Sequence, residues 1–191
     1  MYYGCPAEGG LTAPFLSLVI YIMKRYRRIL VCFDGSDSGK NAFRQACKIV
    51  REDKSWVTAL IVVPSYIDMF QTPAAQEKVQ NSLRNEGEKA LSEINKLARE
   101  EDIAVKAVLE EGIPDEVIEE YAEDGGYNLI VMGRHGKTRL ERALMGSVTA
   151  RVISHSTKDV LVVPGVASLG WKNIFFCTDG SEISRTVMEN A

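Results

Sequence analysis

Short, largely apolar stretches recur along the chain, separated by segments whose apolar positions have helical spacing. A short apolar run bounded by turn residues is typical of a strand that is buried on both faces of a parallel sheet. We expect five such strands, at Ile29–Phe33, Trp56–Val63, Ile103–Leu109, Leu129–Met132 and Val160–Pro164. The alternation predicts an α/β fold, an open five-stranded parallel sheet with helices on both faces.

The segments between these strands have the apolar periodicity of amphipathic helices. Residues 64–76 contain two prolines and show no clear period, so we expect a loop there. We expect four helices: one capped by Ser36 or Ser38, one over Glu77–Glu101, one opening at Gly112 and Pro114 and ended by Gly125 and Gly126, and one beginning near Ser147.

Both ends of the chain fall outside this alternation, which predicts a domain over residues 24–166. Residues 1–23 are expected to be an N-terminal extension outside the fold; either Met23 is the functional start or the residues before it are poorly ordered. Residues 167–191 are interpreted as a linker and the truncated start of a second copy, because residues 177–181 (CTDGS) match residues 32–36 (CFDGS). Chance similarity of two strand-turn segments is the alternative.

Composition and charge narrow the possible partners. The chain of 191 residues has a net charge of −3 and a pI of about 5.5, without the basic excess that is typical of nucleic-acid binders. Its longest apolar run, Phe15–Met23, has nine residues and is too short to span a bilayer. The four cysteines form neither a C-x-x-C pair nor a zinc-binding pattern. We therefore expect a cytoplasmic protein without a nucleic-acid partner, a membrane partner or a metal-ligand cluster.

The loop after the fourth predicted strand has the glycine pattern of a phosphate-binding segment. Gly133 and Gly136 are separated by two residues, and nine more residues precede Gly146 and Ser147. The first two glycines would permit positive φ and a close backbone approach at the carboxyl end of a strand. Gly146 and Ser147 would begin a helix, where unpaired N–H groups favour phosphate. Turn formation and helix capping follow from the same geometry, so the residues alone leave both roles open.

Several charged residues stand in the same loop. Lys137, Arg139 and Arg142 would supply positive charge for a phosphate, although Arg139 and Arg142 could equally form a solvated charged face. His135 has no acidic partner that the sequence identifies, so a general-base role is not assigned to it. No residue is predicted to be catalytic or to bind a metal directly.

The spacing resembles the G-x2-G-x9-G-[S/T] nucleotide signature of the ATP-binding branch of the universal stress protein family, and the resemblance covers nearly all of residues 27–164. It implies the strand order 3-2-1-4-5 and an adenine nucleotide partner, ATP with Mg or Mn. It also implies a homodimer, or pairing with a second domain, through Val160–Val163.

The resemblance assigns roles to individual residues. Cys32 would lie beside the base, Asp34 near the ribose or a phosphate-bound metal, and Val62 would offer backbone groups to the adenine edge. Asp34 could instead be a turn-forming residue that caps the next helix. The residues implied to surround the ribose and phosphates are Met132, Gly133, Arg134, His135, Gly136, Lys137, Gly146, Ser147, Val148 and Thr149. The chain departs from the family pattern at Cys32, where proline is frequent, and at Arg134, where a small residue is usual.

Other phosphate and acyl-transfer motifs are absent. Val131 stands where a P-loop needs its first glycine, and Asp37 stands where a nucleophile elbow needs serine. We therefore interpret the chain as an ATP-binding regulatory module of the stress response. Slow ATP hydrolysis, and protein interaction without a nucleotide, are the two alternatives.

Overall fold

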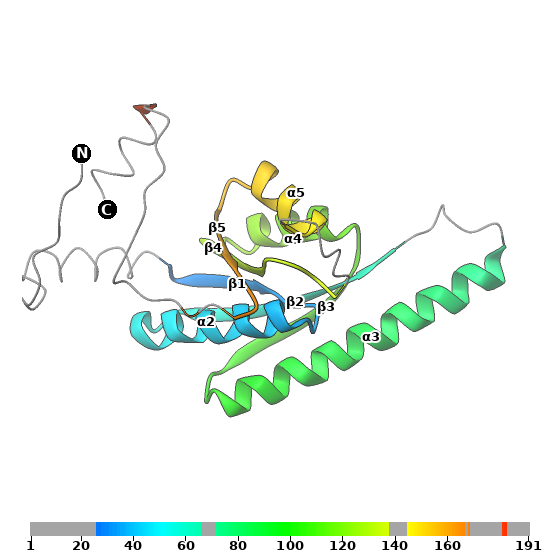
Figure 1. The fold of residues 1–191 in the computed structure, drawn as a ribbon, viewed down its shortest axis with the longest axis horizontal. Coiled ribbons are helices and arrows are strands. Elements are labelled where there is room, and N and C mark those ends of the chain that lie inside the picture. The colour runs from blue at the N-terminus through cyan, green and yellow to red at the C-terminus, as the bar shows by residue number, and fades with distance from the viewer. Residues whose placement is uncertain (1–25, 66–71, 138–144, 167, 169–180, 183–191) are drawn as a thin grey trace, which may run out of the picture. The chain divides into compact units, whose positions relative to one another are not determined.

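The computed structural model describes residues 26–65, 72–137, 145–166, 168 and 181–182. The fold lies in the unit Tyr26–Leu169, one of two compact units of the chain. Strands and helices alternate along it in this order (Figure 1): β1 (Arg28–Cys32), α2 (Asp37–Asp53), β2 (Trp56–Pro64), α3 (Pro73–Glu100), β3 (Val105–Gly112), α4 (Pro114–Asp124), β4 (Leu129–Gly133), α5 (Ser147–His155) and β5 (Asp159–Val163).

The five strands form one parallel sheet in the order β3-β2-β1-β4-β5, which confirms the predicted fold class and strand order. Cys32, the last residue of β1, pairs with Leu60 of β2 on one side and Met132 of β4 on the other. The chain runs outward from β1 through β2 to β3 and then crosses back to β4. The switch in direction therefore falls between the carboxyl ends of β1 and β4, where open α/β sheets place their ligands.

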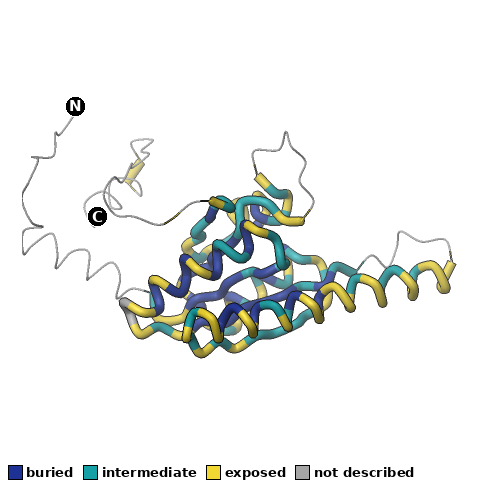
Figure 2. Tube along the Cα trace, turned by 60° about the horizontal axis from the view of Figure 1, so that its bottom comes forward, coloured by how far each residue is buried: buried dark blue, intermediate teal, exposed yellow. Residues whose placement is uncertain are grey.

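Helices cover both faces of this sheet, with α2 and α3 on one face and α4 and α5 on the other (Figure 1). Side chains alternate between the two faces along each strand. In β1, Ile29 and Val31 are fully buried in the cluster beneath α2 and α3, and Leu30 is fully buried in the cluster beneath α4 and α5. Figure 2 shows the central strands as the most continuously buried part of the fold. The apolar runs in the sequence are therefore explained by burial on both faces.

Ser36 caps the first helix, as one of the two predicted alternatives. Its hydroxyl oxygen accepts a hydrogen bond from the Gly39 N–H at 3.0 Å, so α2 begins at Asp37. Ser38, the other candidate, is buried beneath the loop after β4 rather than capping the helix.

Several predicted boundaries were wrong. Gly112, predicted to open a helix, is the last residue of β3, which was predicted to end at Leu109. The long helix begins at Pro73 and not at Glu77, because Thr72 caps it and proline fits the first position of a helix. Strand β3 begins at Val105 and not at Ile103. Asp102 takes a positive φ of 51°, and the Ile103 N–H still bonds the Ala98 carbonyl at 3.0 Å, so the chain first completes the helix end.

Helix α3 is supported by the sheet along only part of its length. Its buried residues all lie between Gly87 and Ala98, and the preceding half reaches past the sheet (Figures 1 and 2). A Cβ at Gly87 would lie 2.6 Å from a methyl of Val63 and 2.8 Å from one of Leu109. Gly87 is therefore where the helix approaches the sheet most closely, and only glycine permits that approach.

The predicted extension over residues 1–23, and almost all of the predicted second copy, lie outside the described residues, as do Arg139 and Arg142. The domain boundaries and the tandem interpretation therefore stay predictions. None of the described helices is long and apolar enough to cross a membrane.

Candidate functional site

Asp34 joins the loop after β1 to the loop after β4. One carboxylate oxygen accepts a hydrogen bond from the Ser36 N–H at 2.9 Å, and the other accepts one from the Lys137 N–H at 3.2 Å. The first bond forms an Asx turn, in which Gly35 takes a φ of 79°. The turn-forming role considered for Asp34 is therefore present, and the same carboxylate also holds the glycine loop at the switch point.

Ser36 makes a second connection between these loops. Its hydroxyl donates to the backbone carbonyl of His135 at 3.2 Å, while its oxygen accepts the capping bond from Gly39. Residues from β1, α2 and the loop after β4 thus form one hydrogen-bonded group. Sequence reasoning identified Ser36 only as a helix cap, because its partner is separated from it by 99 positions.

Gly133 and Gly136 do not take the positive φ that their positions were predicted to permit. Positive φ among the described glycines occurs at Gly35, Gly112 and Gly126, so Gly133 and Gly136 do not need glycine for that reason. A Cβ at Gly133 would lie 2.7 Å from the Ser38 Cβ and 2.8 Å from a backbone nitrogen of α2. A Cβ at Gly136 would lie 2.9 Å from the Asp34 carboxylate. Close packing against α2 and Asp34 therefore explains both residues.

The start of α5 is placed by backbone bonds. The Arg134 N–H donates to the Val163 carbonyl, and the Arg134 carbonyl accepts from the Gly146 N–H, both at 2.9 Å. Thr149 is buried and donates its hydroxyl proton to the Gly133 carbonyl at 3.0 Å. The two ends of the G-x2-G-x9-G segment are therefore held together, with α5 starting beside the end of β4.

The N-terminus of α5 differs from those of α2 and α3. Ser36 and Thr72 cap those two helices with side-chain oxygens, but the N-cap residues of α4 and α5 are Ile113 and Gly146, and no described side chain caps either helix. The next residue, Ser147, is exposed. The first N–H groups of α5 lack a side-chain cap, which is the arrangement that suits an anionic ligand.

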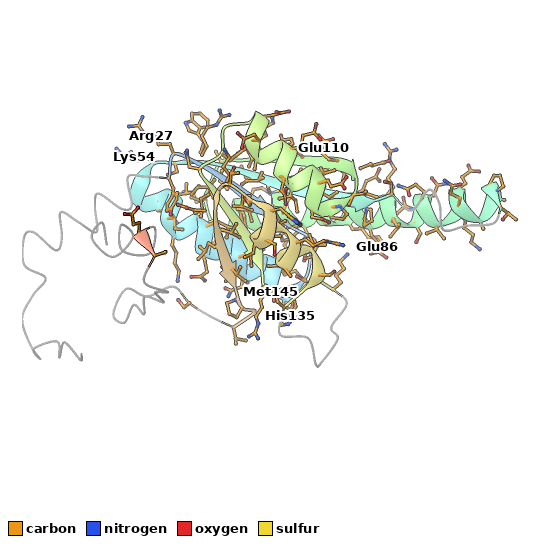
Figure 3. All side chains as sticks on the ribbon, turned by 90° about the horizontal axis from the view of Figure 1, so that it is seen from above. Arg27, Lys54, Glu86, Glu110, His135 and Met145 are labelled. Carbon is orange, nitrogen blue, oxygen red and sulfur yellow. The ribbon has the colours of Figure 1, made fainter. Side chains whose placement is uncertain are left out.

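Lys137 connects the loop to α3. Its ammonium lies 3.3 Å from the carboxylate of Glu86, whose position on α3 Figure 3 shows. Glu93, two turns further along the same helix, forms an ion pair with Lys40 of α2 at 2.7 Å. Sequence reasoning missed Glu86, because nothing in a helical pattern says which solvent-facing carboxylate will meet a distant lysine.

Three half-buried apolar residues lie together on the α5 side of the sheet. Cys32, Val62 and Val148 pack against the same core cluster, beneath α4 and α5. Burial raises the pKa of the Cys32 thiol to about 12, with a further contribution from Asp34, so the thiol is neutral at physiological pH. Met132, another predicted site residue, is almost completely buried.

The backbone groups of Val62 point to the side of β2 on which β1 lies. The Phe33 N–H donates to the Leu60 carbonyl at 2.9 Å, so the backbone groups of Leu60 point toward β1. Alternate residues of a strand direct their backbone groups to the same side, so those of Val62 point the same way. Strand β1 ends at the level of Leu60, and the Val62 groups therefore lie past its end.

Two surface hollows lie elsewhere. One of about 480 Å³ is bordered by α3 and β3, and one of about 280 Å³ is bordered by α2 and residues 165–166. Neither contains a predicted site residue, so the candidate site rests on hydrogen bonds and packing. Within the described part of the chain, no group of three or more His, Cys, Asp or Glu side chains is arranged to hold a metal ion.

These features define a doubly wound α/β domain with a candidate ligand site at the switch point between β1 and β4. The profile of the universal stress protein family matches residues 25–164. This chain belongs to the universal stress protein family.

Individual relatives agree. Universal stress protein MJ0531 of Methanocaldococcus jannaschii is 38% identical over 139 residues, which span 72% of this chain and 82% of the relative. The structure of UspA from Lactobacillus plantarum is 30% identical with a TM-score of 0.66, covering 73% of this chain and 98% of that one. A universal stress protein solved in complex with cAMP is 25% identical with a TM-score of 0.55, covering 73% and 97%.

Proposed function

We propose that this chain is an ATP-binding universal stress protein that acts as a nucleotide-dependent regulatory module. The observation that carries the proposal is the convergence at the switch point of the Asp34 turn, the Gly133–Lys137 segment and the uncapped start of α5. A relative solved with cAMP supports an adenine nucleotide as the ligand class. A base would need an apolar surface and a phosphate would need N–H donors, and the candidate site has residues suited to each.

The base would lie against Cys32, Val62 and Val148. These side chains are half-buried and apolar or neutral, as suits a planar base. The backbone N–H and C=O of Val62 would meet the polar edge of adenine, because they face the side on which β1 has ended. Cysteine in place of the family's frequent proline therefore changes the shape of this wall without adding a charge.

The phosphates would lie at the start of α5 and along the glycine loop. The uncapped N–H groups of α5 would donate to phosphate oxygens, and the exposed Ser147 hydroxyl lies beside them. Lys137 would supply a positive charge. Mg²⁺ or Mn²⁺ bound to the phosphates would neutralise their charge, and Asp34 would be the carboxylate near it. That role fits because each Asp34 oxygen accepts one backbone N–H and still has lone-pair capacity.

Occupancy of the site would be transmitted through Lys137. A phosphate near the glycine loop would compete with Glu86 for the lysine ammonium, which now lies 3.3 Å from that carboxylate. Nucleotide binding would therefore change the contact between the loop and α3. A partner protein that binds this surface would distinguish the two states.

We further propose that two copies of the chain pair through β5. This strand pairs only with β4 among the described strands, so its outer edge is open. Val160, Leu161 and Val162 are half-buried there, which makes the edge apolar. An open apolar edge strand favours pairing with an equivalent edge. A strictly monomeric sedimentation profile at micromolar concentration would contradict this proposal.

Titration calorimetry of the full chain with Mg-ATP tests the nucleotide proposal. The discriminating variant is Gly146→Val, because a Cβ at this position meets no atom closer than 3.4 Å and the fold should survive, while the added side chain would obstruct phosphate. Ala104→Val, at an exposed position beyond the other end of the sheet, is the matched control. We expect binding by wild type and control and none by Gly146→Val.

Two outcomes separate the alternatives. Absence of binding by the folded wild-type chain would overturn the proposal and favour a module that interacts without nucleotide. Release of phosphate over repeated turnovers, also lost in Gly146→Val, would instead establish slow ATP hydrolysis.

A further inference from the structure

A tryptophan lies exposed at the amino end of the sheet, opposite to the proposed nucleotide site. Trp56 is the first residue of β2 and is 80% exposed, although tryptophan is on average a highly buried residue. Its backbone is fixed, because the Trp56 N–H donates to the Arg27 carbonyl at 2.9 Å. The indole is thus held at a rigid strand end and not on a loop.

Two tyrosines and two cations stand on the same face of the sheet. Trp56 and Thr58 alternate onto one face, and the Thr58 hydroxyl oxygen accepts a bond from the Tyr127 hydroxyl at 2.8 Å. Tyr127 stacks on Tyr121 with a centroid distance of 5.9 Å. Arg28, which pairs with Trp56 in register, lies over the Tyr127 ring at 5.4 Å. The aromatic groups are thereby packed and ordered before any partner arrives.

Positive charge surrounds the tryptophan. Arg28 is its neighbour on β1, and Lys106 of β3 lies 3.5 Å from the Tyr121 hydroxyl. Figure 3 shows Arg27 and Lys54 at the same end of the sheet. We call Arg27, Arg28, Lys54, Trp56 and Lys106 the Trp56 surface.

The cations of the Trp56 surface are not neutralised by the described part of the chain. None of the four forms an ion pair with another described side chain, and all four are exposed. Lysines and arginines elsewhere do form such pairs, including Lys40, Lys137 and Lys158. Lys78, Lys89 and Arg99 also form no ion pair with a described side chain, so the four cations are distinguished by their position at the strand end that carries one exposed indole.

We propose that the Trp56 surface binds an acidic segment of a partner protein. Tryptophan and arginine are among the residues most enriched in the energetic centres of protein interfaces, and here an exposed Trp56 stands beside Arg28, which is held in place over the buried Tyr127 ring. Carboxylates of the partner would pair with the four cations while an apolar side chain packs on the indole. A protein segment is favoured over nucleic acid because the chain lacks the overall basic charge that a phosphate backbone requires.

The test uses the full chain with a Trp171→Phe substitution, so that Trp56 is the single remaining tryptophan. Acrylamide quenching first measures the accessibility of Trp56 in the free protein. Fluorescence anisotropy then follows the binding of a dye-labelled short peptide rich in glutamate and aspartate with interspersed leucine. A labelled oligothymidylate of equal charge is titrated in parallel.

The informative variants are Trp56→Ala and the double variant Arg27→Glu/Lys106→Glu. Lys78→Glu/Lys89→Glu on the exposed side of α3 makes the same change in net charge away from the surface. We expect saturable peptide binding that weakens by roughly tenfold or more in both surface variants and stays unchanged in the control. Thermal unfolding confirms that each variant is folded.

Three results would overturn the proposal. A Trp56 shielded from acrylamide in the free protein would mean that another segment or a second copy already covers the surface. Equal weakening of peptide binding by the two double charge-reversal variants would mean that binding depends on net charge and not on the Trp56 surface. Tighter binding of oligothymidylate than of the peptide would assign the surface to nucleic acid.

Discussion

The Lys137 backbone N–H donates to the carboxylate of Asp34 at 3.2 Å across 103 positions of sequence. Because the other oxygen of the same carboxylate accepts the Ser36 N–H, one side chain sets the conformation of two loops. Any ligand at the switch point therefore meets a loop that is already positioned by protein contacts.

Replacing Asp34 should affect both stability and binding. Asp34→Ala removes the acceptor of two charge-assisted bonds, so we expect the free energy of unfolding to fall by about 1–3 kcal/mol. Nucleotide affinity should fall with it, because the glycine loop loses its anchor. Urea unfolding and calorimetry measure the two effects. Glu77→Ala, at an exposed position on α3, provides the charge-matched control, and equal behaviour of the two variants would refute the anchoring role.

Alanine should destabilise the fold more at Gly133 than at Gly146, the two outer glycines of the loop. Gly133→Ala forces a Cβ to 2.8 Å from a backbone nitrogen of α2, so we expect a destabilisation of about 1–3 kcal/mol. Gly146→Ala meets nothing closer than 3.4 Å at a φ of −67°, so only the poorer N-cap should count and the loss should stay below about 1 kcal/mol. Thermal unfolding of both variants decides the matter, and similar losses in the two would contradict the packing account.

Releasing Lys137 from Glu86 should strengthen nucleotide binding, if the proposed function holds. Both side chains of this ion pair are about half exposed, so Glu86→Gln should cost less than about 1 kcal/mol of stability. The freed ammonium would raise ATP affinity by up to roughly fivefold, the factor that corresponds to such a pair. Glu88→Gln, which alters an ion pair with Arg84 on the same helix, should leave affinity unchanged. Calorimetry with ATP measures the affinity of both variants at low and at high salt. The gain in affinity of Glu86→Gln should be smaller at high salt, because salt screens the attraction between the lysine and the phosphates.

Cys47 should make the fold sensitive to alkaline pH. Burial, together with the nearby Glu101, raises the pKa of its thiol from 9.0 to about 12. The unfolded thiol loses its proton near pH 9 while the folded one keeps it, so this stabilising contribution is complete below pH 9 and is lost as the pH rises toward 12. The slope is at most about 1.4 kcal/mol per pH unit for one group.

The measurement is the free energy of unfolding in urea as a function of pH above neutrality. Cys47→Ala creates a small cavity that lowers the free energy of unfolding at every pH. The comparison with wild type therefore uses only the slope of this free energy against pH. We expect a shallower decline in the variant, and parallel curves would show that the thiol does not contribute.

The sheet could be predicted because its physical cause is local. A strand such as Leu129–Gly133, buried on both faces, must be apolar at consecutive positions, and that run is visible without knowing the neighbours. The start of α3 was mislocated because Pro73 was taken as a loop residue, although proline also suits the first turn of a helix. Proline alone therefore does not distinguish a loop from the first turn of a helix, and the Thr72 cap shows that Pro73 begins a helix.

The sequence predicted which residues belong to the candidate site better than it predicted their contacts. The glycine spacing identified the loop, but the reason for Gly133 is the backbone of α2, which approaches from another part of the chain. The ion pair with Glu86 likewise depends on how α3 crosses β2 and β3. Contacts that arise from packing angles leave no trace in periodicity, so sequence reasoning could not find them.

The uneven support of α3 divides one helix into two regions of different local stability. From Gly87 onward, opening the helix would require apolar groups to leave the core, whereas none of the residues before it is fully buried. Amide exchange should therefore change abruptly at this glycine rather than fade gradually along the helix. Glu86 is the last residue on the less protected side, so fraying of that half would release Lys137 without disturbing the sheet.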